Sequence, residues 1–215
     1  KCVKSHYRVK NFAMLIDNKK ALSLWINPKH FSEDNIHSAI SSSNNSAKPW
    51  VILDDFLKLN ILQDIHDFLH KAATYNSNFG LYVRAGGKNT VTVNEEQYLS
   101  APECNRFFRY STLTSLDQAP SRKQLYSALL AILQAPGFVD FAEIIFSAGL
   151  HQCEGIYTNR YNYKDYLNHH SDKLKQRKIA FVLYVSRGWK ISYGGQLQIE
   201  TKKIKWSILT TNSID

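Results

Sequence analysis

Apolar positions recur with a helical period through the first half of the chain. The run Trp50 to Leu53 predicts a short buried strand, after which Asp54 and Asp55 can cap a helix that continues to about Ala73. The apolar residues of this segment fall on one stripe: Leu57, Ile61, Ile65, Phe68, Leu69 and Ala72. We therefore expect an amphipathic helix that covers a core.

Two further helices are predicted after a turn region. The glycines between Phe79 and Thr90 indicate turns, and Ser121 can then cap a helix that ends at Ala135-Pro136-Gly137. Another helix is expected from about Val139 to Ser147.

The pattern changes to short strands from Ile156 onward. β-Branched and aromatic runs alternate with turn residues, in the segments GIYTNRYNY, RKIAFVLYV, GGQLQIE and KIKWSIL. Helices first and strands later favour an α+β fold, with helices packed outside an antiparallel sheet or barrel.

The length of 215 residues fits one elaborated domain. The Ser/Asn cluster from Ile40 to Pro49 predicts a loop, so we expect an N-terminal extension over residues 1–46 and a domain over residues 47–215. A hydrophobic fraction of 44% excludes a disordered chain, and the longest apolar runs are too short to cross a bilayer. The protein is therefore expected to be globular and soluble, without a membrane partner.

The net charge of +9 favours acidic or anionic partners, but the basic residues are scattered. No helix-turn-helix pattern, zinc finger or aromatic-basic RNA motif is present, so nucleic acid is not an expected partner. Cys2, Cys104 and Cys153 are odd in number and far apart, which favours a reducing, cytoplasmic location over a disulfide framework. The start at Lys1 rather than Met leads us to expect missing upstream sequence.

Histidines at i and i+4 in HDFLH, His66 to His70, share a helix face and could bind a metal, as in metalloproteases. Asp67 stands where those enzymes have a glutamate, and no third ligand is evident. We therefore interpret the two histidines as residues at the border of an amphipathic helix.

The triplet His170-Ser171-Asp172 is the stronger candidate for a metal site. In extended backbone, residues i and i+2 project to the same side, so the His170 imidazole and the Asp172 carboxylate can converge on one ion. This donor pair suits Fe(II), and a second histidine would complete a facial triad. His169 should point to the opposite side, so we do not include it among the metal ligands.

The residues around the triplet resemble the Fe(II)/2-oxoglutarate-dependent dioxygenases of the prolyl 4-hydroxylase-like branch. That family shows a tyrosine-containing strand, H-x-D, an arginine-led strand, a tryptophan and Gly-Gly-x-Leu. The matching residues here are Tyr161, His170, Asp172, Arg177, Tyr184-Val185-Ser186, Trp189 and Gly194-Gly195-Gln196-Leu197. Upstream, KPWVILDDFL and LYSALLAILQAPGFVDFAEIIFSAGL also resemble family segments.

The resemblance implies a double-stranded β-helix (jelly-roll, cupin-like) core with flanking helices, in which His170 and Asp172 bind Fe(II). It places Tyr184 on the distal carboxylate of 2-oxoglutarate and Tyr161 near the metal or this cosubstrate. The alternative for both tyrosines is a buried strand residue whose hydroxyl has another partner. Trp189, Gly194 and Gly195 are expected to be architectural.

The family also requires a second histidine and a following Lys or Arg, yet the sequence has no histidine after His170. We expect that the C-terminal strands of the barrel are missing from the chain; the alternative is a protein that has lost part of its site. His151 as a substitute ligand has no support from its spacing.

The implied function is that of a dioxygenase that uses Fe(II), 2-oxoglutarate and O2, with ascorbate as an optional reductant. It would hydroxylate an unactivated C–H bond of a prolyl, amino-acid-like or other small-molecule or peptidyl substrate, releasing succinate and CO2. The alternative is a catalytically inactive jelly-roll module that binds a partner. The sequence fixes neither the substrate nor the oligomeric state.

Overall fold

The computed structural model describes residues 19–45, 50–115, 120–172, 176–199 and 207–210. The helices are α2 (Glu33–Ser43), α3 (Leu59–Lys71), α4 (Glu95–Ser100), α5 (Pro120–Gln134) and α6 (Pro136–Phe146). The strands are β1 (Trp50–Ile52), β2 (Thr74–Tyr82), β3 (Thr90–Val93), β4 (Arg106–Ser115), β5 (Asn159–Arg160), β6 (Tyr166–Leu167), β7 (Ala180–Leu183) and β8 (Ser207–Thr210). Short 3-10 turns lie at Pro28–Phe31, Glu103–Asn105 and Ile191–Tyr193.

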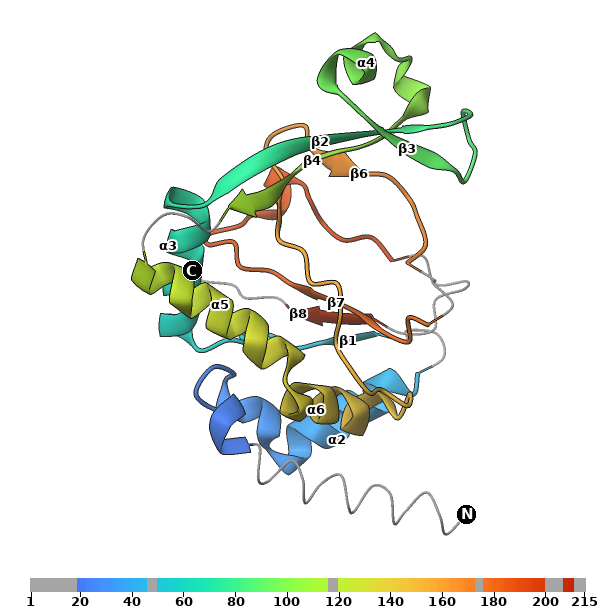
Figure 1. Cartoon of the computed structure of the whole chain (residues 1–215). Coiled ribbons are helices and arrows are strands. Elements are labelled where there is room, and N and C mark those ends of the chain that lie inside the picture. Colours follow the sequence, from blue (N-terminus) through green and yellow to red (C-terminus); the bar gives the residue numbers. More distant parts are fainter. Residues whose placement is uncertain (1–18, 46–49, 116–119, 173–175, 200–206, 211–215) are drawn as a thin grey trace.

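The strands form two sheets. One sheet has the order β3-β2-β4-β5 with β6 also paired to β4, and all of its pairs are antiparallel. In the other, β8 lies between β1 and β7 and is parallel to both. Figure 1 shows the long antiparallel pair β2 and β4 towards one end of the molecule, the parallel sheet in the middle, and α2 and α6 beyond it.

Helices combined with an antiparallel sheet confirm the expected mixed architecture and are consistent with an oxygenase fold. The parallel β1-β8-β7 sheet was not expected, because the sequence pattern predicted strands in antiparallel order only. The closed double-stranded β-helix stays a prediction.

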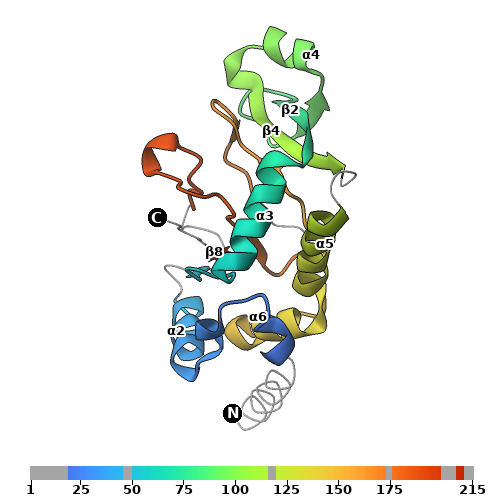
Figure 2. The ribbon, with the colours of Figure 1, turned by 90° about the vertical axis from the view of Figure 1, so that its left-hand side faces the viewer.

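One hydrophobic core joins the helices to the parallel sheet. Its most completely buried large side chains include Phe56, Phe68 and Phe141, each at 2% exposure or less. Figure 2 shows α3 crossing beside β8, with α5 to one side and α2 and α6 below. Leu22 and Ile36 belong to the same core, so the described part of the first 46 residues packs with the rest of the chain. The domain boundary at residue 47 remains a prediction.

Helix α3 confirms the predicted amphipathic segment but begins later than expected. Its buried residues are Leu62, Ile65, Phe68 and Leu69, and its N-cap is Lys58 rather than Asp54 or Asp55. Asp55 has φ 51°, outside the extended conformation that an N-cap residue adopts. The chain instead turns here, and Phe56 and Leu57 become buried before the helix starts.

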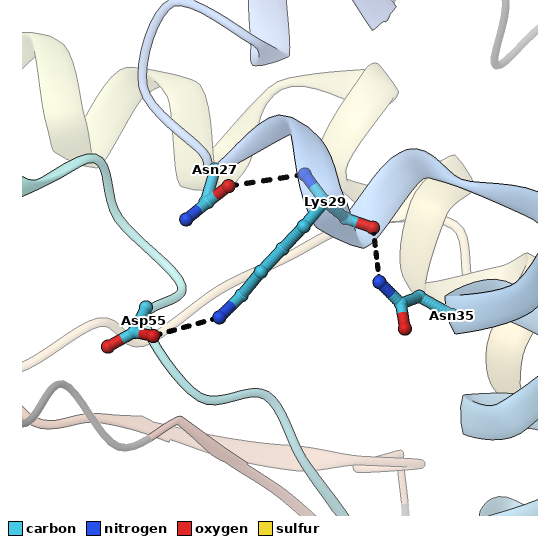
Figure 3. A network of polar contacts seen from close by, with 4 residues as sticks. All are labelled: Asn27, Lys29, Asn35 and Asp55. Atoms are coloured by element: carbon cyan, nitrogen blue, oxygen red, sulfur yellow. Dashed lines mark hydrogen bonds and ion pairs between the residues drawn. The ribbon is translucent and has the colours of Figure 1, made fainter.

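A polar network holds this turn against the preceding segment (Figure 3). Lys29 Nζ forms an ion pair with Asp55 Oδ2 at 2.8 Å. The Asn27 side chain accepts a hydrogen bond from Lys29 N, and Asn35 Nδ2 donates to Lys29 O at 2.6 Å. The Asp55 carboxylate therefore binds a lysine instead of capping α3.

The predicted break between the next two helices is confirmed at Ala135. Helix α6 begins at Pro136, three residues before the expected start, because proline is favourable in the first turn of a helix. Helix α5 begins at Pro120, so Ser121 lies inside its first turn rather than at its cap. Among the described helices, no single one is both long and apolar enough to cross a membrane; α5 and α6 meet that criterion only together, with a 46° bend.

Several segments differ from the sequence prediction. Ile40 to Ser43, predicted as part of a loop, is the last turn of α2. Phe79 to Tyr82, predicted as turn, is the end of β2, and Gly80 pairs there with Phe108 of β4. The prediction of a strand over GGQLQIE is wrong for the described residues, Gly194–Ile199, which have no regular secondary structure. Gly194 and Gly195 have φ 74° and 77°, and two consecutive positive φ angles interrupt an extended strand. Of KIKWSIL, only residues 207–209 lie within the described part, in β8.

Candidate metal and cosubstrate site

The site is built on one edge of β4, where the short strands β5 and β6 pair with it. The turn that joins them contains Lys164 at φ 66°, and Asp165 Oδ2 accepts a hydrogen bond from Asn162 N at 2.8 Å. The Asp165 side chain, only 4% exposed, pairs with Arg109 Nε of β4 at 3.0 Å. This ion pair, in which the carboxylate is buried and the Arg109 side chain is 39% exposed, fastens the turn to β4, and β6 then leads into the H-x-D triplet.

The structure brings His170 and Asp172 together, as the alternation of extended backbone predicted. His170 Nε2 lies 3.5 Å from Asp172 Oδ1. Nitrogen and oxygen ligands each lie about 2.1 Å from a metal such as zinc, so two donor atoms at this separation can share one ion. Their assignment as metal ligands stays a prediction.

The hydrogen bond on the other side of the imidazole also fits a metal ligand. His170 Nδ1 lies 3.0 Å from Asn168 O, and since a carbonyl only accepts, Nδ1 carries the hydrogen. In the neutral ring this leaves the lone pair on Nε2, the atom that faces Asp172. Such an outer hydrogen bond is a regular feature of histidine ligands.

The electrostatics of the pair favour a protonated His170 and an ionised Asp172. The Asp172 hydrogen bond is the main reason that the pKa of His170 is raised above its ordinary value. The hydrogen bond from His170 and the charges of His170 and Arg177 lower the pKa of Asp172. Arg177 lies 3.1 Å from Asp172 Oδ1, so a bound cation would share this carboxylate with the guanidinium.

Both predicted cosubstrate tyrosines have raised pKa values. Burial, together with Tyr110, Tyr184 and Asp165, raises the pKa of Tyr161 to about 12. Burial also raises the pKa of Tyr184, and this effect outweighs a hydrogen bond with the Leu197 backbone that lowers it. Both phenols therefore stay protonated at neutral pH and can donate hydrogen bonds. Their role in cosubstrate binding stays a prediction.

Sequence reasoning missed a row of aromatic rings that connects Tyr161 to His170. We call these residues the aromatic row: Tyr82, Phe107, Phe108, Tyr110 and Tyr161. Adjacent ring centroids lie 4.9 to 5.6 Å apart, and the Phe107 ring meets the His170 ring edge-on at 6.3 Å. The signal was present in FFRY, residues 107–110, but it becomes a row only once β4 and β5 are paired.

The other candidate metal ligands do not complete this site within the described residues. The rings of His66 and His70 are stacked at 5.6 Å, and His66 Nδ1 contacts Val185 O at 3.0 Å. In the part of the chain that the structure describes, no three His, Cys, Asp or Glu residues gather as a metal site, so neither the HDFLH pair nor His151 adds a third ligand to His170 and Asp172.

Trp189 and the glycines shape the segment that follows β7. Trp189 Nε1 donates to Gly194 O at 2.9 Å, which closes the loop around the 3-10 turn. The positive φ angles of Gly194 and Gly195 confirm that glycine is used here for its conformational freedom.

Residues 156–212 match the family model of the 2OG-Fe(II) oxygenase superfamily. The matched segment contains Tyr161, His170, Asp172 and Tyr184. The match supports an oxygenase of the dioxygenase type and implies Fe(II) and 2-oxoglutarate as cofactors; it does not define a branch or a substrate. Searches of curated proteins and of solved structures found no match.

Proposed function

We propose that this protein is an Fe(II)- and 2-oxoglutarate-dependent dioxygenase that hydroxylates an unactivated C–H bond. The observation that supports this most is the convergence of His170 Nε2 and Asp172 Oδ1, 3.5 Å apart, inside the segment that matches the oxygenase superfamily. Neither observation is sufficient alone, because an H-x-D triplet is common and a family match does not identify ligands.

In this proposal, His170 and Asp172 hold the iron, and the hydrogen bond to Asn168 O keeps the Nε2 lone pair available. Bound Fe(II) and 2-oxoglutarate would supply O2 activation, with release of succinate and CO2. The protonated Tyr184 hydroxyl would donate a hydrogen bond to the distal carboxylate of the cosubstrate, and Tyr161 would lie beside it.

We further propose the double-stranded β-helix core and the prolyl 4-hydroxylase-like branch, with a small-molecule or peptidyl substrate. The aromatic row supports this choice, since aromatic-lined surfaces bind proline-rich segments through their ring faces. Four of its five rings are half-buried and Tyr161 is 43% exposed, so the row offers apolar surface next to His170. Free thiols at Cys104 and Cys153 are in keeping with a cytoplasmic location.

A second candidate is a jelly-roll module without catalytic activity. The observation in its favour is that Arg177 already neutralises Asp172, while the described residues bring no third ligand to the pair. In such a module the basic chain would bind an acidic partner.

Anaerobic titration with Fe(II) and 2-oxoglutarate separates the two candidates. We expect the weak visible charge-transfer band of this complex in the wild type and its loss in Asp172→Ala. Succinate formation, measured separately in the presence of O2, should also be lost in Asp172→Ala. The matched control is Asp67→Ala, which removes a helix-surface carboxylate paired with Lys71. A wild type without the band, or an Asp172→Ala variant with unchanged turnover, would contradict the enzyme assignment.

A further inference from the structure

We infer that Asn168 is the positioning residue of this site: its side-chain amide clamps the segment to β4 so that its own carbonyl sets the tautomer of His170. The inference rests on the proposed function, because it assigns a purpose to the lone pair that this tautomer leaves on Nε2. Asn168 was not a candidate from the sequence.

Asn168 is fastened to β4 by two hydrogen bonds. Its main-chain N–H donates to Phe107 O at 3.0 Å, and its side-chain Nδ2 donates to Arg106 O at 2.9 Å. Two neighbouring carbonyls of one strand therefore hold both donors of a single residue. A side chain without an N–H in this position would leave only the main-chain bond.

The carbonyls that accept these bonds lie at an irregularity of β4. Gly80 of β2 pairs with Phe108, whereas Leu81 pairs with Arg106, so Phe107 is an extra residue in the ladder. Such bulges redirect side chains at functional sites. Here the bulge presents the Phe107 ring to His170 and, from the same backbone, the carbonyls that hold Asn168.

Arg106 is itself fixed, so its carbonyl is a stable acceptor. Its guanidinium donates to the main-chain oxygens of Tyr98, Leu99 and Ala101, at 2.9 to 3.2 Å, around the C-terminal end of α4. The hydrogen-bond chain thus runs from α4 through Arg106 and Asn168 to the imidazole of His170.

The consequence concerns the direction of one lone pair. With Asn168 O held in place, His170 keeps a hydrogen on Nδ1 and turns Nε2 towards Asp172, so a bound cation would displace only the proton that Nε2 shares with Asp172. Without the side-chain clamp, Asn168 can rotate, and the ring can exchange tautomers or turn away from the carboxylate. Loss of such an outer hydrogen bond typically weakens metal binding about 10- to 100-fold.

The test uses Asn168→Ala and Asn168→Leu, of which the second retains side-chain volume. The control is Asn162→Ala, in the nearby turn, where main-chain atoms of Asn162 bond to Asp165: the N–H donates to Asp165 Oδ2 and the carbonyl accepts from the Asp165 N–H. The first readout is the ¹⁵N shifts of the His170 ring in metal-free protein that also carries Asp172→Ala, at about pH 9 where imidazole is neutral. This background removes the carboxylate that would compete with Asn168 O for the single ring hydrogen. The second is the Kd for Co(II) added alone, with far-UV circular dichroism as the check of folding.

In the Asp172→Ala background we expect an Nδ1–H tautomer with Asn168 intact and with Asn162→Ala, and a mixture of tautomers with either Asn168 substitution. With Asp172 intact, the Kd for Co(II) should be raised about 10-fold or more in both Asn168 variants. Folded Asn168 variants with an unchanged tautomer or an unchanged Kd would overturn the inference and leave the proposed function intact. A wild type that binds no metal would instead overturn the proposed function, and the tautomer alone would then decide the role of Asn168.

Discussion

The helical core and the β4 edge are stabilised by different kinds of interaction. In the core, Phe141 is 1% exposed and packs against Phe31 and Phe56. At the β4 edge, His170 and Asp172 have side chains 37% and 55% exposed, and they are oriented by hydrogen bonds and charge. Core substitutions should therefore change the free energy of unfolding, whereas substitutions at the site should change ligand binding with little effect on folding.

Phe141→Ala should give the largest change in stability. Removing a fully buried ring leaves a cavity, and this typically costs about 3–5 kcal/mol of unfolding free energy. Chemical denaturation of wild type and variant would measure the loss. If the two regions are independent, the folded fraction of Phe141→Ala should bind Co(II) with wild-type affinity. A parallel loss of affinity would show that the core and the site are coupled.

Gly80→Ala should affect both regions, because Gly80 lies beside the bulge. A Cβ at this position would lie 2.3 Å from Phe108 Cε1, so the ring must move, at a typical cost of about 1–3 kcal/mol for overpacking. Phe108 contacts Phe107, which meets the His170 ring, so weaker Co(II) binding is also expected. The second substitution Phe108→Leu should restore part of the stability; no restoration would show that the overlap is not the cause.

The smallest effect concerns pH. The pKa of His170 in the metal-free protein, followed by NMR, should lie above 6.5, since its hydrogen bond with Asp172 favours the protonated ring. Asp172→Asn should lower this pKa, and Arg177→Gln should raise it, because the Arg177 charge opposes protonation. A His170 pKa that does not respond to Asp172→Asn would contradict the geometry of the pair.

The same pKa shifts determine how the stability of the fold changes with pH. The raised pKa of His170 stabilises the fold at low pH and loses its effect as pH rises through the folded-state value. The lowered pKa of Asp172 stabilises the fold above its ordinary value of 3.8 and loses its effect as pH falls. The pair therefore contributes most between about pH 4 and 6.5, and only weakly, because both groups are exposed to solvent.

The parts of the fold with a local cause could be predicted. The stripe that contains Ile65, Phe68 and Leu69 is set by helical period and is buried in α3. The proximity of His170 and Asp172 was predicted from their i, i+2 spacing, although the triplet follows β6 and is not itself in a strand. Both depend on residues close together in the sequence.

The features that could not be predicted depend on strand pairing and contacts between residues far apart in the sequence. Asn168 and the aromatic row become visible only when β4 aligns with β5 and β6, over about fifty residues of sequence. Gly80 suggested a turn by composition, yet it is needed in a strand because Phe108 occupies the space of its missing side chain. The start of α3 was misplaced because Asp55 binds Lys29, a partner 26 residues earlier.

The most direct test of the central claim is the crystal structure of the protein soaked anaerobically with Fe(II), using anomalous scattering at the iron edge. We predict one anomalous peak bound by His170 Nε2 and Asp172 Oδ1, at about the 2.0–2.2 Å typical of nitrogen and oxygen ligands. Density that shows both side chains unchanged, with Asp172 still paired to Arg177 and no peak beside them, would contradict the claim.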